Sequence, residues 1–275
     1  MKAICELCPR HCNLSEGQLG FCRARINREG CVVCENYGRI TSIALDPIEK
    51  KPFRRFHPGA KILSIGSYGC NMDCDYCQNS EIARADCESI CWDAVSPEEL
   101  ASLAAAYRLQ GNIGLAFTYN EPLVGYEFVL DCAKQVKARG LITAVVSNGM
   151  IDQKHWEALI PWIDAANIDL KAFTQEGYFA LGGDLETVKR TIALAYDKMH
   201  LELTTLIVPG FNDSEDDMRR ECAWIQSLSP EIPLHLSRFF PRHRMQGLYA
   251  TPVETIQNLA RIARDYLQFV YLGNM

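Results

Sequence analysis

Residues 62–77 read Ile62-Leu63-Ser64-Ile65-Gly66-Ser67-Tyr68-Gly69-Cys70-Asn71-Met72-Asp73-Cys74-Asp75-Tyr76-Cys77. The apolar first part predicts a buried strand, and the polar, glycine-containing second part predicts a loop. Three thiolates on one short loop can face one centre. Three ligands leave a fourth position open, whereas a structural zinc site closes with four. We therefore expect a reactive iron–sulfur cluster with an open iron here. The alternatives are three ordinary loop cysteines or a zinc knuckle with a distant fourth ligand.

The sequence after residue 61 alternates between short apolar runs and amphipathic stretches. The runs predict strands at Lys61–Ser67, Gly114–Thr118, Leu141–Ser147, Ala165–Leu170, His200–Leu206 and Pro233–Ser237, with a short last strand at Gln268–Leu272. The amphipathic stretches predict helices at Pro97–Gln110, Leu123–Ala138, Lys154–Leu159, Leu185–Tyr196, Ser214–Ser227 and Pro252–Tyr266.

Six strand–helix units in series favour a parallel sheet, because parallel neighbours need crossover helices. We expect an α/β fold, a partial (β/α)6 barrel whose site lies at the C-terminal ends of the strands. A doubly wound sheet is the alternative, but no Gly-rich phosphate loop follows the first strand. The expected domains are a cysteine-rich module at 1–60 and the barrel with a C-terminal helix and short strand at 61–275.

Composition excludes several protein classes. The chain has 275 residues, a formal net charge of −6 and 48% hydrophobic residues, which is ordinary for a globular protein and unlike a disordered chain or a coiled coil. No apolar run approaches the roughly 20 residues of a membrane span. The first residues lack the apolar core of a signal peptide. We expect a cytoplasmic protein.

The chain has thirteen cysteines, an odd number that cannot all form intrachain disulfides. A reducing cytoplasm does not favour structural disulfides, so metal or redox chemistry is the better explanation. Four near the N-terminus follow the pattern Cys5-x2-Cys8-x3-Cys12-x9-Cys22, which can close a four-thiolate site. A polar segment with no core of its own needs such a staple. Zinc is slightly favoured at this site. A second iron–sulfur cluster and cysteines without a metal are the two alternatives. Cys31, Cys34, Cys87, Cys91, Cys132 and Cys222 stay unassigned.

The motif Cys70-x3-Cys74-x2-Cys77, with Tyr76 before its last cysteine, resembles the cluster motif of the radical SAM superfamily. The resemblance implies a 4Fe-4S cluster held by these three catalytic cysteines, with S-adenosylmethionine chelated to its fourth iron. It further implies that one electron cleaves the cofactor to methionine and a 5′-deoxyadenosyl radical, which abstracts hydrogen from a substrate. A low-potential donor such as flavodoxin or ferredoxin would supply the electron.

The resemblance extends to the ends of the later strands. Asn120 and Glu121 stand where the activating-enzyme branch has a Gly-Gly-Glu-Pro-like motif for the methionine amino group, although the two glycines are absent here. The further positions that it implies as cofactor contacts, with Tyr76, are Ser147 and Asn148, Asp169, Lys171 toward the cofactor carboxylate, Val208 toward adenine, and His235 on the carboxylate side.

Each of these positions also has an ordinary structural explanation. Asn148-Gly149 is a common turn sequence, and Pro209-Gly210 is typical of a loop. Asp169 and Lys171 can form a surface ion pair of little value. A lone histidine such as His235 is more often a hydrogen-bonded core residue. The functional interpretation depends on all of them falling at successive strand ends.

Several segments together resemble the radical SAM component of the AmmeMemoRadiSam system, a relative of pyruvate formate-lyase activating enzymes. They are Cys5–Cys12, Gly20–Cys22, Asp46–Pro52, Tyr119–Pro122, His235–Arg238 and Tyr271–Asn274. This resemblance implies two partner proteins, one of the AMMECR type and one of the Memo type. Cys31, Cys87 and Cys91 depart from its pattern.

Two basic, aromatic stretches, Lys50–His57 and Arg238–Arg244, are expected to flank the open end of the barrel. Arginine binds phosphate or carboxylate, and aromatic rings stack on bases, so they suggest a nucleotide-like or phosphate-bearing substrate. A solvated rim is the alternative. The acidic net charge argues against sequence-independent binding of nucleic acid. Two other functions stay open, a glycyl-radical activating enzyme and a protein that only carries metal clusters or electrons.

Overall fold

A single eight-stranded sheet organises the computed structural model, which describes residues 1–275. The strand order is β14-β13-β12-β11-β10-β9-β7-β6, and all neighbours are parallel except β6, which runs antiparallel to β7. The bounds are β6 Ser42–Pro47, β7 Lys61–Gly66, β9 Asn112–Phe117, β10 Ile142–Ser147, β11 Ala165–Asp169, β12 His200–Ile207, β13 Leu234–Arg238 and β14 Val270–Gly273. The α/β fold with a mainly parallel sheet is confirmed, and each predicted strand is present.

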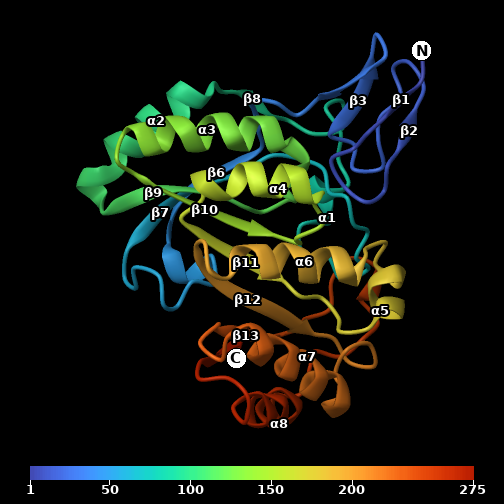
Figure 1. Cartoon of the computed structure of the whole chain (residues 1–275), viewed down its shortest axis with the longest axis vertical. Helices are drawn as coiled ribbons and strands as arrows, with labels where there is room; N and C mark the ends of the chain where they lie inside the picture. Colours follow the sequence, from blue (N-terminus) through green and yellow to red (C-terminus); the bar gives the residue numbers. More distant parts are fainter.

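The connecting helices cover one face of this sheet in chain order, from α2 at the top of Figure 1 to α8 at the bottom. Their bounds are α2 Pro97–Ala106, α3 Tyr126–Ala138, α4 Gln153–Leu159, α6 Leu185–Ala195, α7 Glu215–Leu228 and α8 Val253–Ala263. The helix α2 begins as its sequence predicts, with Pro97 in its first turn and a capping box between Ser96 and Glu99. Two short helices, α1 (Ser80–Ala83) and α5 (Gln175–Ala180), lie in stretches too short for a periodic signal.

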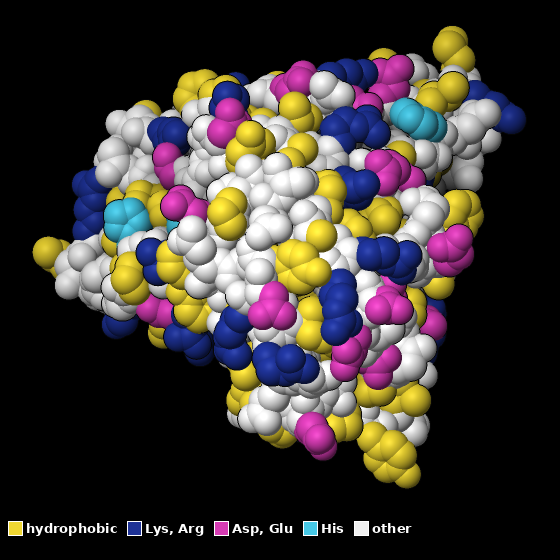
Figure 2. Space-filling model, turned by 60° about the horizontal axis from the view of Figure 1, so that its bottom comes forward, with side chains coloured by type: hydrophobic (Ala, Val, Ile, Leu, Met, Phe, Trp, Pro, Cys, Tyr) yellow, Lys and Arg dark blue, Asp and Glu magenta, His cyan; other side chains and the backbone are white.

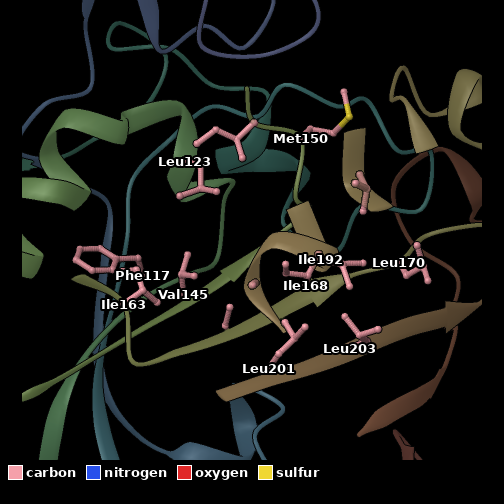
Figure 3. Packing of buried hydrophobic residues seen from close by; sticks show 14 of the residues in the cluster. Phe117, Leu123, Val145, Met150, Ile163, Ile168, Leu170, Ile192, Leu201 and Leu203 are labelled. Atoms are coloured by element: carbon pink, nitrogen blue, oxygen red, sulfur yellow. The ribbon is translucent and has the colours of Figure 1, made fainter. Parts of the chain in front are cut away.

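The two faces of the sheet differ in polarity because side chains alternate along each strand. One set, including Val145, Ile168 and Leu203, packs with helix residues such as Ile192 in a buried cluster of 52 residues, of which Figure 3 shows a part. The other set lines the inside of the barrel and is largely polar. It includes the buried residues Ser64, Thr118, Asn167, Glu202, Thr204 and His235.

The segment 48–57 closes the N-terminal end of the barrel, and we call it the barrel floor. Its apolar residues Ile48 and Phe53 pack against residues near the strand starts, among them Ile62. The Phe56 ring stacks on that of His200, the first residue of β12, with centroids 5.0 Å apart. The later part of the stretch Lys50–His57 therefore lies at the closed end of the barrel and not beside its open end as expected. Lys50, Lys51 and Pro52 do line the cavity that opens at the strand ends, so the expectation was right only for these first residues.

The buried carboxylate of Glu202 anchors this floor. It accepts hydrogen bonds from the backbone N–H groups of Arg54 and Arg55, at 3.0 and 2.8 Å. It also pairs with the imidazoles of His200 and His235, at 2.8 and 2.5 Å. Burial alone would raise the pKa of Glu202, but these hydrogen bonds outweigh it and lower the pKa to about 2.

The N-terminal module, residues 1–41 in the structure, consists of short paired strands beside the barrel, at the upper right of Figure 1. They are β1 Ala3–Ile4 with β2 Asn13–Leu14, β3 Arg25–Arg28 with β4 Cys31–Cys34, and β5 Arg39–Ile40 with the distant β8 Asp93–Ala94. The expected boundary at residue 60 falls later than this, because β6 and the barrel floor already belong to the barrel.

No helix has the length and apolar character to cross a bilayer. Acidic and basic side chains are interspersed on the face in Figure 2, which shows no broad field of one sign.

The Glu202 network predicts a pH-dependent loss of stability. With a folded pKa of about 2 against an ordinary 4.5, Glu202 contributes about 3 kcal/mol above pH 4.5, which is lost as the pH falls toward 2. We expect Glu202→Gln to lower the free energy of unfolding in urea by about that amount at pH 7, and by less at pH 3. The exposed Glu186→Gln is the control, with a change within about 0.5 kcal/mol. Equal effects of the two substitutions would contradict the assignment.

Candidate active site

A cavity of about 360 Å³ opens at the C-terminal ends of the strands. The loop after β7 contributes the side chains of Cys70, Cys74 and Cys77 to its wall. The residues that line it from the following strand ends are Asn120 and Glu121 after β9, Ser147 and Asn148 at β10, Asp169 and Lys171 at β11, and Thr204 and Leu206 on β12. The structure thus brings most of the predicted site residues together around one space.

The three thiols suit a cluster that keeps one position open. Such a cluster is held at separate irons, so its ligand sulfurs are spread around it. Burial raises the pKa of Cys70 and Cys77, and that of Cys74 to about 11, so a metal must displace their protons when it binds.

Tyr76 reaches the same cavity. Its side chain is buried, and its hydroxyl has no hydrogen-bond partner within the chain. A buried hydroxyl without a partner is costly. The observation is consistent with a ligand or water completing this part of the wall.

Glu121 connects two strand ends. One carboxylate oxygen accepts from the Ser147 hydroxyl at 2.8 Å and from the Leu123 N–H at 3.0 Å, and the other accepts from the Asn148 N–H at 2.7 Å. Burial nevertheless raises its pKa to about 7. A buried carboxylate of this kind is stabilised in its charged form by an approaching cation, such as an ammonium group.

Asn120 and Asn148 hold the cysteine loop. The Asn120 amide donates to the carbonyls of Tyr68 and Gly69, at 3.1 and 3.0 Å, and its oxygen accepts from the Ser67 N–H. The Asn148 amide donates to the Asn71 side-chain oxygen at 2.9 Å and lies 3.6 Å from the Cys70 sulfur. Both lie where the sequence predicted, but their amides are already engaged by the protein.

Asp169 and Lys171 form an ion pair with 2.9 Å between Oδ2 and Nζ. Burial acts to lower the pKa of Lys171, but Asp169 and Cys74 outweigh it and raise the pKa well above its ordinary value. The pair lies in the cavity wall, so the alternative of a surface ion pair does not describe it.

Two predicted cofactor contacts lie outside this cavity wall. Val208 is buried, and its N–H donates to the Asn212 side chain at 2.7 Å. His235 faces Glu202 and stacks on Tyr271 with centroids 5.3 Å apart. The geometry of His235 matches its alternative explanation as a hydrogen-bonded core histidine.

Several residues that line the cavity were not named as site residues from the sequence. They are Thr118 and Tyr119 after β9, Ser237 at β13 and Asn274 after β14, while Lys51 and Pro52 were expected only as part of the basic stretch Lys50–His57. Lys51, Tyr119, Ser237 and Asn274 all lie in the segments that resemble the AmmeMemoRadiSam component. Their place in these segments was the feature of the sequence that could have identified them as cavity residues.

The N-terminal cysteines Cys5, Cys8, Cys12 and Cys22 line one small pocket of about 10 Å³, together with Asn71 of the cysteine loop. Cys22 is ten residues from Cys12 in the sequence, but the fold places it beside the other three. In neither group of cysteines are three side chains close enough to enclose one metal ion.

The module that carries them packs directly on the cysteine loop. Gly69 has φ +93°, and a Cβ there would lie 2.5 Å from the Cys22 carbonyl oxygen. The Arg10 guanidinium donates to the carbonyls of Asn71 and Gly182. The same guanidinium lies 3.5 Å from the centroid of the Phe21 ring.

Comparison with known proteins adds a family. The sequence profile described as the Radical SAM superfamily matches residues 64–222. A protein described as uncharacterized from Methanocaldococcus jannaschii is 36% identical over 277 aligned residues, covering all of this chain and 82% of that protein.

More distant similarities agree with this family. Pyruvate formate-lyase 1-activating enzyme of Escherichia coli is 26% identical over 175 residues, which cover 59% of this chain and 67% of that protein. The crystal structure of Streptococcus suis SuiB bound to S-adenosylmethionine has a TM-score of 0.57 at 11% identity, covering 77% of this chain and 51% of that chain. At that identity the likeness concerns the fold.

The close contact at Gly69 predicts that a methyl group there separates the module from the cysteine loop. Gly69→Ala is expected to lower the melting temperature and to at least halve the iron bound after anaerobic reconstitution, because the obstacle is backbone. Gly59→Ala is the matched control, since Gly59 also has a positive φ but nothing within 4 Å of the added Cβ. It should cost only about 1 kcal/mol of left-handed strain and bind iron normally. Normal iron content in both variants would contradict the prediction.

Proposed function

The chain belongs to the radical SAM superfamily, and on that premise we propose that it generates a radical from S-adenosylmethionine and uses it on a small substrate bound in the same cavity. The observation that carries the proposal is the single cavity that three cysteines share with the charged residues of the next strand ends. An electron carrier that only houses a cluster has no need for such residues.

Cys70, Cys74 and Cys77 would hold the cluster in this proposal. When bound, the 4Fe-4S cluster and S-adenosylmethionine supply one-electron cleavage to methionine and a 5′-deoxyadenosyl radical, which takes a hydrogen atom from substrate. Glu121 would attract the ammonium group of the cofactor, and Lys171 its carboxylate. Tyr76 and the polar strand ends would exclude bulk water, and Asn120 and Asn148 would keep the cysteine loop in place.

The second part of the proposal is a metal centre formed by Cys5, Cys8, Cys12 and Cys22. Its support is the common pocket of these four side chains and the small hydrophobic core of their module. Four thiolates close a zinc site and equally suit an iron–sulfur cluster. In either case the metal stabilises the surface on which the cysteine loop packs, since Gly69 and Asn71 contact this module.

We further propose that the enzyme works with AMMECR-type and Memo-type proteins and receives its electron from a flavodoxin or ferredoxin. The support is the sequence resemblance, because four of its six segments contribute to the cavity wall: Lys51 and Pro52, Tyr119 to Glu121, Ser237 and Asn274 all line it. Residues specific to one subfamily are expected where a substrate is selected.

The second candidate function is activation of a glycyl-radical enzyme. It is favoured by the similarity to pyruvate formate-lyase activating enzymes. In that case the substrate is a backbone glycine of a large partner, and an EPR doublet of a glycyl radical in the partner would decide for it.

Anaerobic assay of 5′-deoxyadenosine tests the proposed function. Reconstituted protein with dithionite and S-adenosylmethionine is expected to form it, and Cys74→Ala to lower the yield by about 100-fold or more, because the cluster loses a ligand. The exposed Cys91→Ala serves as the control and should keep the yield. A wild-type protein that binds its cluster but forms no 5′-deoxyadenosine would refute the proposal.

Metal analysis of the triple variant Cys70→Ala, Cys74→Ala, Cys77→Ala tests the second centre. We expect about one zinc or about four irons per chain to remain. Adding Cys8→Ala and Cys22→Ala should remove that metal. Trace amounts of both metals in the triple variant would overturn the second centre.

A further inference from the structure

The barrel floor presents a buried lysine to the reaction cavity. The Lys51 side chain is only 5% exposed, and its Nζ lies 2.9 Å from Asp46 Oδ2 and 3.3 Å from the Tyr119 hydroxyl oxygen. The structure gives this ammonium group two acceptors for its three N–H bonds. The remaining donor is available to a molecule in the cavity that Lys51 lines.

The floor carries more positive than negative charge. Asp46 is shared by Lys51 and by Lys50, whose Nζ lies 3.4 Å from its other oxygen, and both lysines line the cavity. The Tyr119 hydroxyl also donates to Asp46, at 2.9 Å. One carboxylate therefore faces two ammonium groups, in a protein whose net charge is negative.

The tyrosine beside this lysine is held in an unusual conformation. Tyr119 has φ +72°, which is rare and costly for a bulky residue. Its ring lies 4.3 Å from Lys51 Nζ, and room for the ring exists because residue 66 is glycine, where a Cβ would lie 2.8 Å from Tyr119 Cδ2. The contact between Lys51 and Tyr119 is therefore formed despite backbone strain at Tyr119.

Lys171, a third lysine of the cavity wall, lies in a different place. It is paired with Asp169 at a strand end, in the part of the wall proposed for S-adenosylmethionine. Lys51 instead lies on the floor, next to Pro52, whose carbonyl accepts from the Asn167 amide in the barrel interior at 2.9 Å. The two lysines belong to different elements of the cavity wall.

We propose that the floor binds a small anionic substrate, with Lys51 as the contact for its carboxylate or phosphate group. Tyr119 and Asp46 orient the lysine. This inference rests on the proposed function for the identity of the ligand as a substrate, but anion binding at the floor can be measured without turnover.

Calorimetry on the reconstituted protein with saturating S-adenosylmethionine tests the floor site. The probes are methylphosphonate and acetate at fixed ionic strength, with acetamide as the neutral analogue of acetate. Wild type is expected to bind one or both anions and not acetamide. Preference for methylphosphonate identifies a phosphate site, and preference for acetate a carboxylate site.

Two substitutions should change this affinity in opposite directions. Lys51→Met removes the positive charge and is expected to weaken anion binding by about tenfold or more. Asp46→Asn removes the opposing negative charge and is expected to strengthen it by about fivefold. Lys198→Met, at an exposed lysine paired with Asp197, is the control and should leave the affinity unchanged.

Anion binding that survives Lys51→Met would overturn the inference, as would wild-type protein that binds neither probe. Should Lys51→Met fail to fold, Asp46→Asn decides, because weaker or unchanged binding there contradicts the predicted sign. The 5′-deoxyadenosine assay is separate. Its failure in wild type would refute the proposed function and leave the anion site to the calorimetry.

Discussion

A cysteine loop that lies inside a protein must satisfy its backbone polar groups without a helix or a sheet. Here side chains from three other parts of the chain help to do so. Asn36 and Asn120 both donate to the Tyr68 carbonyl, and Arg10 donates to that of Asn71. The side-chain amide of Asn71 in turn donates to the Met150 carbonyl at 2.6 Å and ties the loop to that segment. The position of the three thiols, and with it the cavity, depends on these bonds.

The polar interior of the barrel follows from the same rule applied to charges. Buried charged groups are tolerated when each has a partner. Glu202 has two histidines and two backbone N–H groups, Asp169 has Lys171, and Asp46 has two lysines. Glu121 in the cavity wall differs from these, because its donors are all neutral. Its raised pKa marks it as the carboxylate of the cavity best suited to receive a cation from a ligand.

The N-terminal module and the barrel depend on one another. The module has a small hydrophobic cluster, in which Cys22 and Ala24 meet Val124 of the barrel, and its Cys5, Leu7 and Ile40 join the main core of the protein. Its four cysteines line one pocket, and Gly69 of the cysteine loop packs closely against it. Disorder in the module would therefore disturb the position of the cysteine loop.

Local patterns in the sequence were enough for the fold class, the strand order along the chain and the cysteine loop. Apolar runs and the spacing of Cys70, Cys74 and Cys77 are properties of neighbouring residues, and parallel strands place their C-terminal ends at one edge. Together with the resemblance to the radical SAM superfamily, this was enough to expect Glu121, Asn148, Asp169 and Lys171 at the site.

Only the tertiary structure decided what each remaining side chain faces. His235 pairs with Glu202. The barrel floor packs against residues near the strand starts. Lys51 contacts Tyr119, which is 68 residues later in the sequence. Such contacts depend on the curvature of the sheet and on the path of an irregular segment, and neither leaves a periodic signal in the sequence. The physical reason is that a buried charge pairs with the group that lies next to it in the folded chain. That neighbour is determined only by how the strands and loops are arranged in space.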